Sequence, residues 1–244
     1  PYQPEVSQGT LRYIFEYQSM ITELTGMDCT NASMYDGATA AAEAMMMAMA
    51  ATKKKTRVLL SEGLLPQVIK VVKTYAKFNG VQLGMIPCID GATSYGALAA
   101  ELAAGDVAGV LVPGINRYGV IEDLTGFADA VHAQKGLLMV YSDPSSLAVI
   151  KPPGEWGADI VTHSTTKYMD GHAVAVGGCV IDSGNFDWEA QHDRFTCLTE
   201  PDESYHGLIY TKNFGRAAYI TKMVSQVMRD LGAMMAPENA FLLN

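Results

Sequence analysis

The stretch Asp159-Ile160-Val161-Thr162-His163-Ser164-Thr165-Thr166-Lys167-Tyr168 decides the fold, because an apolar strand in it runs directly into hydroxyl groups and a lysine. Lys167 at the end of a buried strand can be desolvated enough to lose its proton and form a Schiff base with an aldehyde cofactor. The hydroxyls of Ser164 and Thr166 can bond a phosphate. Together they indicate pyridoxal 5'-phosphate, although a motif of this kind taken alone is more often a polar loop with a surface lysine.

Asp143 is the candidate partner for the pyridine nitrogen of such a cofactor, because a protonated ring needs an anion beside it. It follows the apolar run Leu137–Ser142, one predicted strand before Lys167. Parallel strands end at one edge of a sheet, where ligands of open α/β folds bind. The alternative is that Asp143-Pro144 only initiates a turn. Because Lys167 follows the next predicted strand, we favour the role of Asp143 as the partner of the ring nitrogen.

A third candidate element is the segment Asn31–Thr39, which precedes the alanine- and methionine-rich run Ala40–Ala51. The run predicts a buried helix, and the first turn of a helix offers free N–H groups and a positive dipole end to a phosphate. Gly37, Ala38 and Thr39 are therefore candidate phosphate ligands. The alternative is an ordinary N-cap by Asp36 with nothing bound. The methionines in the run are more simply core residues.

Strands and helices alternate along the chain. Apolar runs predict strands at about 56–60, 82–87, 107–112, 137–142, 159–162 and 176–181. Helical patterns are predicted at about 37–52, 63–77, 93–104 and 121–134, with a final helix near 211–231. This alternation predicts an α/β fold, a mostly parallel sheet covered by helices on both faces.

Composition limits the function classes. The 244 residues, of which 49% are hydrophobic, suffice for one domain, and no linker or internal repeat divides them. A net charge of −9 argues against nucleic acid or an anionic membrane as partner. The four cysteines show no disulfide pattern, which favours a cytoplasmic location. His163, His172 and Cys179 match no common zinc spacing, so no metal is expected.

Longer strings reveal a first family resemblance, over residues 1–160. Pro1–Leu11, Ala32–Thr39 and Lys151–Ile160 resemble subunit 1 of the decarboxylating glycine dehydrogenase, the P-protein of the glycine cleavage system. A second resemblance begins at about Gly157. The strings His163–His172, Gly184–Trp188, Leu198–Asp202, Ser204–Gly207 and Asn239–Leu243 resemble the Cys/Met-metabolism pyridoxal phosphate enzymes, most closely O-acetylhomoserine sulfhydrylase.

Both families belong to the fold type I pyridoxal phosphate superfamily, so the resemblance implies a three-layer α/β/α sandwich around a mostly parallel seven-stranded sheet. Lys167 would be the Schiff-base lysine, Ser164 and Thr166 the phosphate-binding hydroxyls, and Asp143 the ring-nitrogen carboxylate. Asn116 falls near the place where the superfamily often puts a group beside the phenolic oxygen of the cofactor, although Pro113–Asn116 matches neither family's motif well.

The chain also departs from both families. The lysine of glycine dehydrogenase belongs to subunit 2, yet Lys167 follows a start that resembles subunit 1. The loop Ser61–Pro66 offers no aromatic residue or histidine to stack on the cofactor ring, and the small C-terminal domain of the superfamily is absent. These features suggest one large domain over 1–244 with a family seam at 157–160, the organisation of an engineered chimera.

Two classes of function remain open. One is a pyridoxal phosphate enzyme that acts on an amino acid, either like the glycine decarboxylase P-protein or in γ-replacement or γ-elimination of sulfur amino acids. The other is a domain of this fold without turnover. Because superfamily sites are completed by a second subunit and Pro1–Gln8 has few apolar residues, we expect a homodimer, or a partner subunit, across which this segment lies.

Overall fold

A seven-stranded sheet forms the centre of the protein. The structure is a computed structural model and describes residues 4–52, 55–164, 177–229 and 234–239. The strand order is β1-β9-β8-β7-β6-β2-β3. In chain order these strands are β1 (Cys29–Thr30), β2 (Arg57–Ser61), β3 (Gln82–Ile86), β6 (Val107–Pro113), β7 (Leu137–Ser142), β8 (Ile160–Ser164) and β9 (Gly178–Asp182).

The sheet is mostly parallel, as the sequence predicts. Strands β3, β2, β6, β7 and β8 pair in parallel, whereas β9 runs antiparallel to β8, and β1 antiparallel to β9. The predicted parallel pairing of the strand near 159–162 with the strand 137–142 is confirmed, with Ser142 opposite His163. The carboxyl ends of β6, β7 and β8 therefore meet at one edge of the sheet. A separate hairpin joins β4 (Cys88–Ile89) and β5 (Ala92–Thr93).

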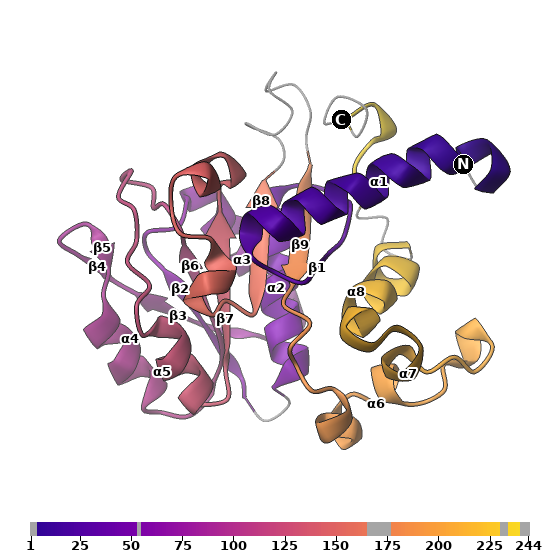
Figure 1. Cartoon of the computed structure of the whole chain (residues 1–244). Coiled ribbons are helices and arrows are strands. Elements are labelled where there is room, and N and C mark those ends of the chain that lie inside the picture. The colour runs from indigo at the N-terminus through magenta and orange to yellow at the C-terminus, as the bar shows by residue number, and fades with distance from the viewer. Residues whose placement is uncertain (1–3, 53–54, 165–176, 230–233, 240–244) are drawn as a thin grey trace.

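Helices cover both faces of the sheet. They are α1 (Pro4–Thr25), α2 (Gly37–Ala51), α3 (Pro66–Asn79), α4 (Tyr95–Leu102), α5 (Phe127–Ala133), α6 (Thr196–Thr199), α7 (Tyr210–Phe214) and α8 (Ala218–Lys222). One core cluster packs α2 and α3 on one face, and a second packs α1, α4 and α5 on the other (Figure 1). Successive side chains of a strand point to opposite faces of the sheet: Leu138 packs in one core cluster and Met139 in the other. The three-layer α/β/α sandwich is thus confirmed.

Local sequence explains where the two helices nearest the sheet edge begin. Asp36 caps α2, because its side chain accepts a hydrogen bond from the N–H of Thr39 at 2.7 Å. Helix α3 begins with Pro66, whose missing N–H costs nothing in the first turn, and ends at Gly80 with φ 68°.

The helix predicted at 121–134 begins later, at Phe127. A buried polar network holds the preceding loop in another conformation. The Asn116 amide donates to Glu122 Oε1 at 2.8 Å, and Glu122 accepts from the N–H of Thr93 at 2.9 Å. These bonds tie residues 116–122 to the β4–β5 hairpin, so Glu122 is not available for the first turn of the helix.

The single helix predicted near 211–231 is wrong over its described part, because the chain there is broken. Helix α7 ends at Gly215, whose φ of 52° and ψ of −119° are not helical. A 3-10 turn (Gly215–Ala217), α8 and a π-helical turn (Met223–Met228) follow. The shorter helical turns between 144 and 205 are η1 (Pro144–Ala148), η2 (Pro153–Trp156), η3 (Glu189–Arg194) and η4 (Glu203–Tyr205).

Two further elements, α1 and β1, are not among the predicted ones. Tyr17 and Ile21 anchor the second half of α1 in the core, whereas Leu11, Phe15 and Met20 are exposed. The first half of α1 extends beyond the rest of the protein (Figure 1). Within the described ranges, no helix combines the length and apolarity needed to span a bilayer.

The strands on the two sides of the predicted seam at 157–160 share one core. Met139 of β7, before the seam, and Val180 of β9, after it, belong to the same core cluster as α2. The organisation of 1–244 as one domain is consistent with this packing, and it stays a prediction.

Candidate functional site

A cavity of about 680 Å³ lies at the carboxyl edge of the parallel strands. Its walls come from the start of α2, the ends of β6, β7 and β8, the first turn of α3, and η1. We call it the edge cavity. Of the predicted site residues, Gly37, Ala38, Asp143 and Ser164 line it. Residues more than 100 positions apart in the chain therefore meet where the sequence expects a cofactor.

The N-terminus of α2 presents free backbone donors to the edge cavity. Thr39 N–H is bonded to the Asp36 side chain, and Ala40 N–H to the Asp36 carbonyl at 2.9 Å. Gly37 N–H and Ala38 N–H have no hydrogen-bond partner among the described residues. The N-cap alternative is thus part of the structure, and it leaves two N–H groups for an anion.

Close packing holds the start of α2 against the sheet. A Cβ on Gly37 would lie 2.6 Å from Cβ of Ser164, and a Cβ on Gly178 would lie 2.5 Å from the Asp36 carbonyl carbon. Only glycine fits at distances this short. The two glycines therefore bring the free N–H groups of α2 beside the Ser164 side chain.

Asp143 starts a turn and also lines the edge cavity. Its Oδ1 accepts hydrogen bonds from Ser145 N–H at 2.9 Å and from the Ser145 hydroxyl at 2.8 Å, which starts η1. Its other oxygen, Oδ2, has no bond within the described residues. Asp143 is thus a turn residue with one carboxylate oxygen available, and it lines the edge cavity.

Tyr141 and Ser142 also line the edge cavity, and the sequence does not single them out. Burial, followed by the charges of Asp36 and Asp143, raises the pKa of Tyr141 to about 12, so its phenol stays neutral; it also hydrogen bonds with Ser164. The Ser142 hydroxyl is buried and has no partner among the described residues. Their position at the end of the strand that precedes Asp143 is the signal that could have identified them.

His163 is buried beneath the site and is not among the residues that line the edge cavity. Its Nδ1 lies 2.7 Å from the Ser142 carbonyl, an acceptor, so Nδ1 carries the proton. Burial lowers the pKa of His163 to about 4, and the imidazole is neutral. It supports the backbone of β7 next to Asp143.

The remaining predicted site residues lie elsewhere or cannot be placed. Asn116 does not line the edge cavity; its amide donates to Gly91 and Glu122, and its oxygen accepts from two backbone N–H groups. Thr39 bonds to Asp36 through its N–H and to Tyr75 through its hydroxyl. Thr166 and Lys167 lie outside the described residues. The roles of all four stay predictions.

Apolar side chains form part of the wall. Leu65, in the loop where the sequence offers no aromatic residue or histidine, lines the edge cavity, as do Val68 and Ile115. An apolar wall opposite polar groups is typical of small-molecule sites.

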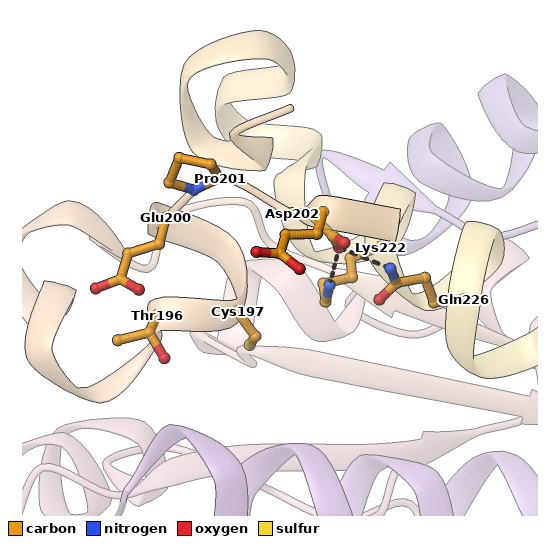
Figure 2. A pocket seen from close by; sticks show the side chains of 8 residues that line it. Thr196, Cys197, Glu200, Pro201, Asp202, Lys222 and Gln226 are labelled. Atoms are coloured by element: carbon orange, nitrogen blue, oxygen red, sulfur yellow. Dashed lines mark hydrogen bonds and ion pairs between the residues drawn. The ribbon is translucent and has the colours of Figure 1, made fainter. Parts of the chain in front are cut away.

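A second, polar hollow lies among the short helices that follow β9. Figure 2 shows Thr196, Cys197 and Glu200 on one side of it and the Asp202–Lys222 ion pair on the other. Lys222 Nζ and Gln226 Nε2 both bond Asp202 Oδ2, at 2.7 and 2.6 Å. The charged and polar atoms of these three side chains are therefore hydrogen bonded to one another. No cluster of His, Cys, Asp or Glu able to hold a metal is found in the ranges that the structure describes.

Comparison with known proteins gives one family match and a set of relatives. The model of the glycine cleavage system P-protein family matches residues 1–194. A probable glycine dehydrogenase (decarboxylating) subunit 1 of Anoxybacillus flavithermus is 53% identical over 161 residues, 66% of this chain and 36% of the relative. Its counterpart in Exiguobacterium sibiricum is 52% identical over 160 residues. The chain thus spans about a third of the length of these relatives.

Solved structures extend the comparison to the fold. The inhibitor-bound glycine decarboxylase (P-protein) of the glycine cleavage system superposes with a TM-score of 0.68 at 39% identity, over 75% of this chain and 41% of that one. An O-acetylhomoserine (thiol)-lyase of Campylobacter jejuni, whose structure contains N'-pyridoxyl-lysine-5'-monophosphate, has a TM-score of 0.74 at 21% identity, over 93% of this chain and 53% of that one. The fold is that of fold type I pyridoxal phosphate enzymes.

Proposed function

Because the chain belongs to the glycine cleavage system P-protein family, we propose that it binds pyridoxal 5'-phosphate in the edge cavity and acts in amino-acid metabolism as part of a P-protein-like enzyme. The observation that carries the proposal is the meeting of Asp143, Ser164 and the free N–H groups of α2 in one cavity. The solved relative that contains pyridoxyl-lysine phosphate and shares this fold supports the choice of cofactor.

The donor set fits the proposed cofactor. The N–H groups of Gly37 and Ala38 and the Ser164 hydroxyl suit the phosphate. The Asp143 Oδ2 atom, which bonds none of the described residues, suits a protonated ring nitrogen. Leu65 and Ile115 would exclude water from the ring.

Pyridoxal phosphate, when bound, supplies an electron sink for charge that develops at the α-carbon of an amino acid. The contribution of the chain is to hold and polarise the cofactor. The Asp143 carboxylate would keep the ring nitrogen protonated, and the neutral His163 holds the carbonyl of Ser142 in place beneath it. Lys167 is the residue that we assign to covalent attachment and to moving the proton at the substrate α-carbon.

The test is cofactor binding with site-specific attachment. Pyridoxal phosphate added to the protein should give a visible absorbance band, and borohydride should fix the cofactor on Lys167 in peptide mapping. Label spread over Lys53 to Lys55, or no band, would contradict the proposal. Turnover of glycine or of an O-acylated homoserine by the loaded protein separates an active enzyme from a fold without activity.

Asp143→Asn tests the ring-nitrogen role. We expect the affinity for pyridoxal phosphate to fall about tenfold, because a charge-assisted hydrogen bond is lost. Asp123→Asn is the matched control, since Asp123 makes the same turn, accepting from Thr125 N–H at 3.0 Å and from the Thr125 hydroxyl at 2.6 Å, but does not line the edge cavity. Equal affinity in both variants would refute the role.

Association and location are further parts of the proposal. The subunit 1 relatives imply a partner subunit or an oligomer, and we propose a homodimer that covers the exposed Leu11, Tyr13 and Phe15 of α1. Light scattering that finds a monomer at high micromolar concentration would reject it. All four cysteines are free, which supports a reducing, cytoplasmic location.

A further inference from the structure

A second cavity, of about 230 Å³, lies at the other end of α2, where this helix meets the segment that follows β9. We call it the aromatic cavity. Its walls are mostly apolar, and the principal side chains are Met46, Met47, Trp188, Phe195, Tyr219 and Met223. It shares no lining residue with the edge cavity, so a ligand here would be distinct from the cofactor.

Packed rings form one wall of the aromatic cavity. Trp188 stacks on Tyr219 with centroids 5.8 Å apart and an interplanar angle of 15°, and it meets Phe195 edge-on at 4.9 Å. Trp188 is 8% exposed, so this wall is held firmly. The faces of such rings attract cations.

A carboxylate that pairs with none of the described residues also lines this cavity. Glu43, on α2, lines the aromatic cavity and is half-buried. None of the described residues forms an ion pair or hydrogen bond with its carboxylate. Burial alone raises its pKa, which shows the cost of leaving it unpaired.

A second carboxylate, whose Oδ1 accepts from Gly184 N–H at 3.1 Å, lies next to this cavity. Asp182 is 4% exposed, and its Oδ2 has no partner among the described residues. It lines a small hollow that shares Met47, Ala51 and Trp188 with the aromatic cavity. Negative groups therefore flank the aromatic wall on two sides.

The ammonium group that lines the aromatic cavity already has an ion-pair partner. Lys222 also lines the aromatic cavity, but its ammonium bonds Asp202 Oδ2 at 2.7 Å and lies 4.7 Å from the ring centre of Tyr210. Figure 2 shows this ion pair in the polar hollow. The charge of Lys222 is thus neutralised by Asp202.

We propose that the aromatic cavity binds a small organic cation, an ammonium group on an apolar or aromatic body. The ammonium would lie between the Glu43 carboxylate and the rings of Trp188 and Tyr219, and the apolar body among the methionines. The charge of such a ligand would then face Glu43 and the rings, and its apolar body the methionines, whereas an anion would be repelled by the Glu43 carboxylate.

Trp188 provides the readout, because the chain has two tryptophans and Trp156 lies in η2, outside the aromatic cavity. In a Trp156→Phe background, trimethyl(2-phenylethyl)ammonium should change the fluorescence of Trp188 in a saturable way. This quaternary cation has no N–H and cannot condense with pyridoxal phosphate, so the result is independent of the cofactor site. 2-Phenylethanol and 3-phenylpropionate, the neutral and anionic analogues, should bind at least about tenfold more weakly.

Variants separate charge recognition from simple filling of an apolar space. Glu43→Gln should weaken binding of the cation about tenfold and leave 2-phenylethanol unchanged, whereas Glu155→Gln, at an exposed position, should change neither. Ala50→Phe, from an exposed position in the lining, should block all three probes. Equal binding of cation and alcohol, an unaltered affinity in Glu43→Gln, or no saturable signal would overturn the proposal.

Discussion

The two ends of helix α2 present different groups to two separate cavities. At its first turn, backbone N–H groups face the edge cavity, and the nearest side chains are small and polar. Farther along, Glu43 and Met47 face the aromatic cavity, where side chains make all the contacts. One alanine- and methionine-rich helix thus supplies a dipole at one site and an apolar surface at the other.

The two cavities differ in which part of the chain supplies the residues that line them. The edge cavity uses a glycine, a capping aspartate and strand ends, which the family match over residues 1–194 includes. The aromatic cavity needs Phe195, Tyr219 and Met223, which lie beyond that match. The first site therefore belongs to the family scaffold, and the second depends on how the later segment packs onto it.

The largest change in stability is expected from shortening methionines on the two sides of α2. Met45 is fully buried against the sheet, so Met45→Ala should cost about 2–5 kcal/mol of unfolding free energy. Met46 lines the aromatic cavity and is half-buried, so Met46→Ala should cost less than about 1 kcal/mol. Urea denaturation measures both. Equal losses would mean that the aromatic cavity is as closely packed as the core.

Two buried groups should give opposite pH dependences. His163 titrates near 4 in the folded protein and near 6.5 when unfolded, so its contribution to stability, about 3 kcal/mol, is lost as pH falls from 6.5 to 4. Asp182 titrates near 6 when folded and 3.8 when unfolded, so a similar amount is lost as pH rises from about 4 to 6. In the native chain the two trends oppose each other between pH 4 and 6.

Single variants should expose each trend. In Asp182→Asn, stability should rise with pH between 4 and 6, because the effect of His163 is no longer opposed by that of Asp182. In His163→Gln, it should fall over the same range. Chemical denaturation at several pH values measures the slopes, and equal slopes in the two variants would contradict the assignment.

Gly37 tests the close contact at the first turn of α2. A Cβ there would lie 2.8 Å from Cα and 2.9 Å from N of Ser164, so Gly37→Ala must displace the helix start and should cost about 1–3 kcal/mol. It should also weaken binding of pyridoxal phosphate. Gly96→Ala is the matched control: Gly96 lies within α4 with no atom in reach, so the change should stabilise by up to about 1 kcal/mol.

The smallest effect is expected at the cap itself. Asp36→Ala removes the acceptor for Thr39 N–H and should cost about 1 kcal/mol. Asp36→Asn keeps an acceptor oxygen, so it should cost only a few tenths of the loss expected for Asp36→Ala. Thermal unfolding that finds the two variants equally unstable would show that the charge, not the hydrogen bond, stabilises the helix start.

Much of the sheet follows from local sequence. Buried parallel strands such as β6 and β7 are continuous apolar runs. Strand β6 ends at Pro113, and β7 ends at Ser142, directly before Asp143-Pro144. The meeting of Gly37, Asp143 and Ser164 follows in turn, because parallel strands end at one edge.

Other features could not be read locally. The strand near 176–181 has the same apolar pattern whichever way it runs, and only its pairing with β8 makes it antiparallel. Asn116 follows a strand end as Asp143 does, yet its amide turns to Glu122, because that buried carboxylate needs donors.

The sequence by itself determined the α/β class, the position of most strands, and the set of polar residues at their carboxyl ends, since each depends on neighbours in the chain. The tertiary structure alone decided which of those residues line a common cavity, and it created the aromatic cavity from Glu43, Trp188 and Tyr219. The physical reason is that burial and charge compensation arise between segments far apart in the chain, and no local pattern of residues records which segments will touch.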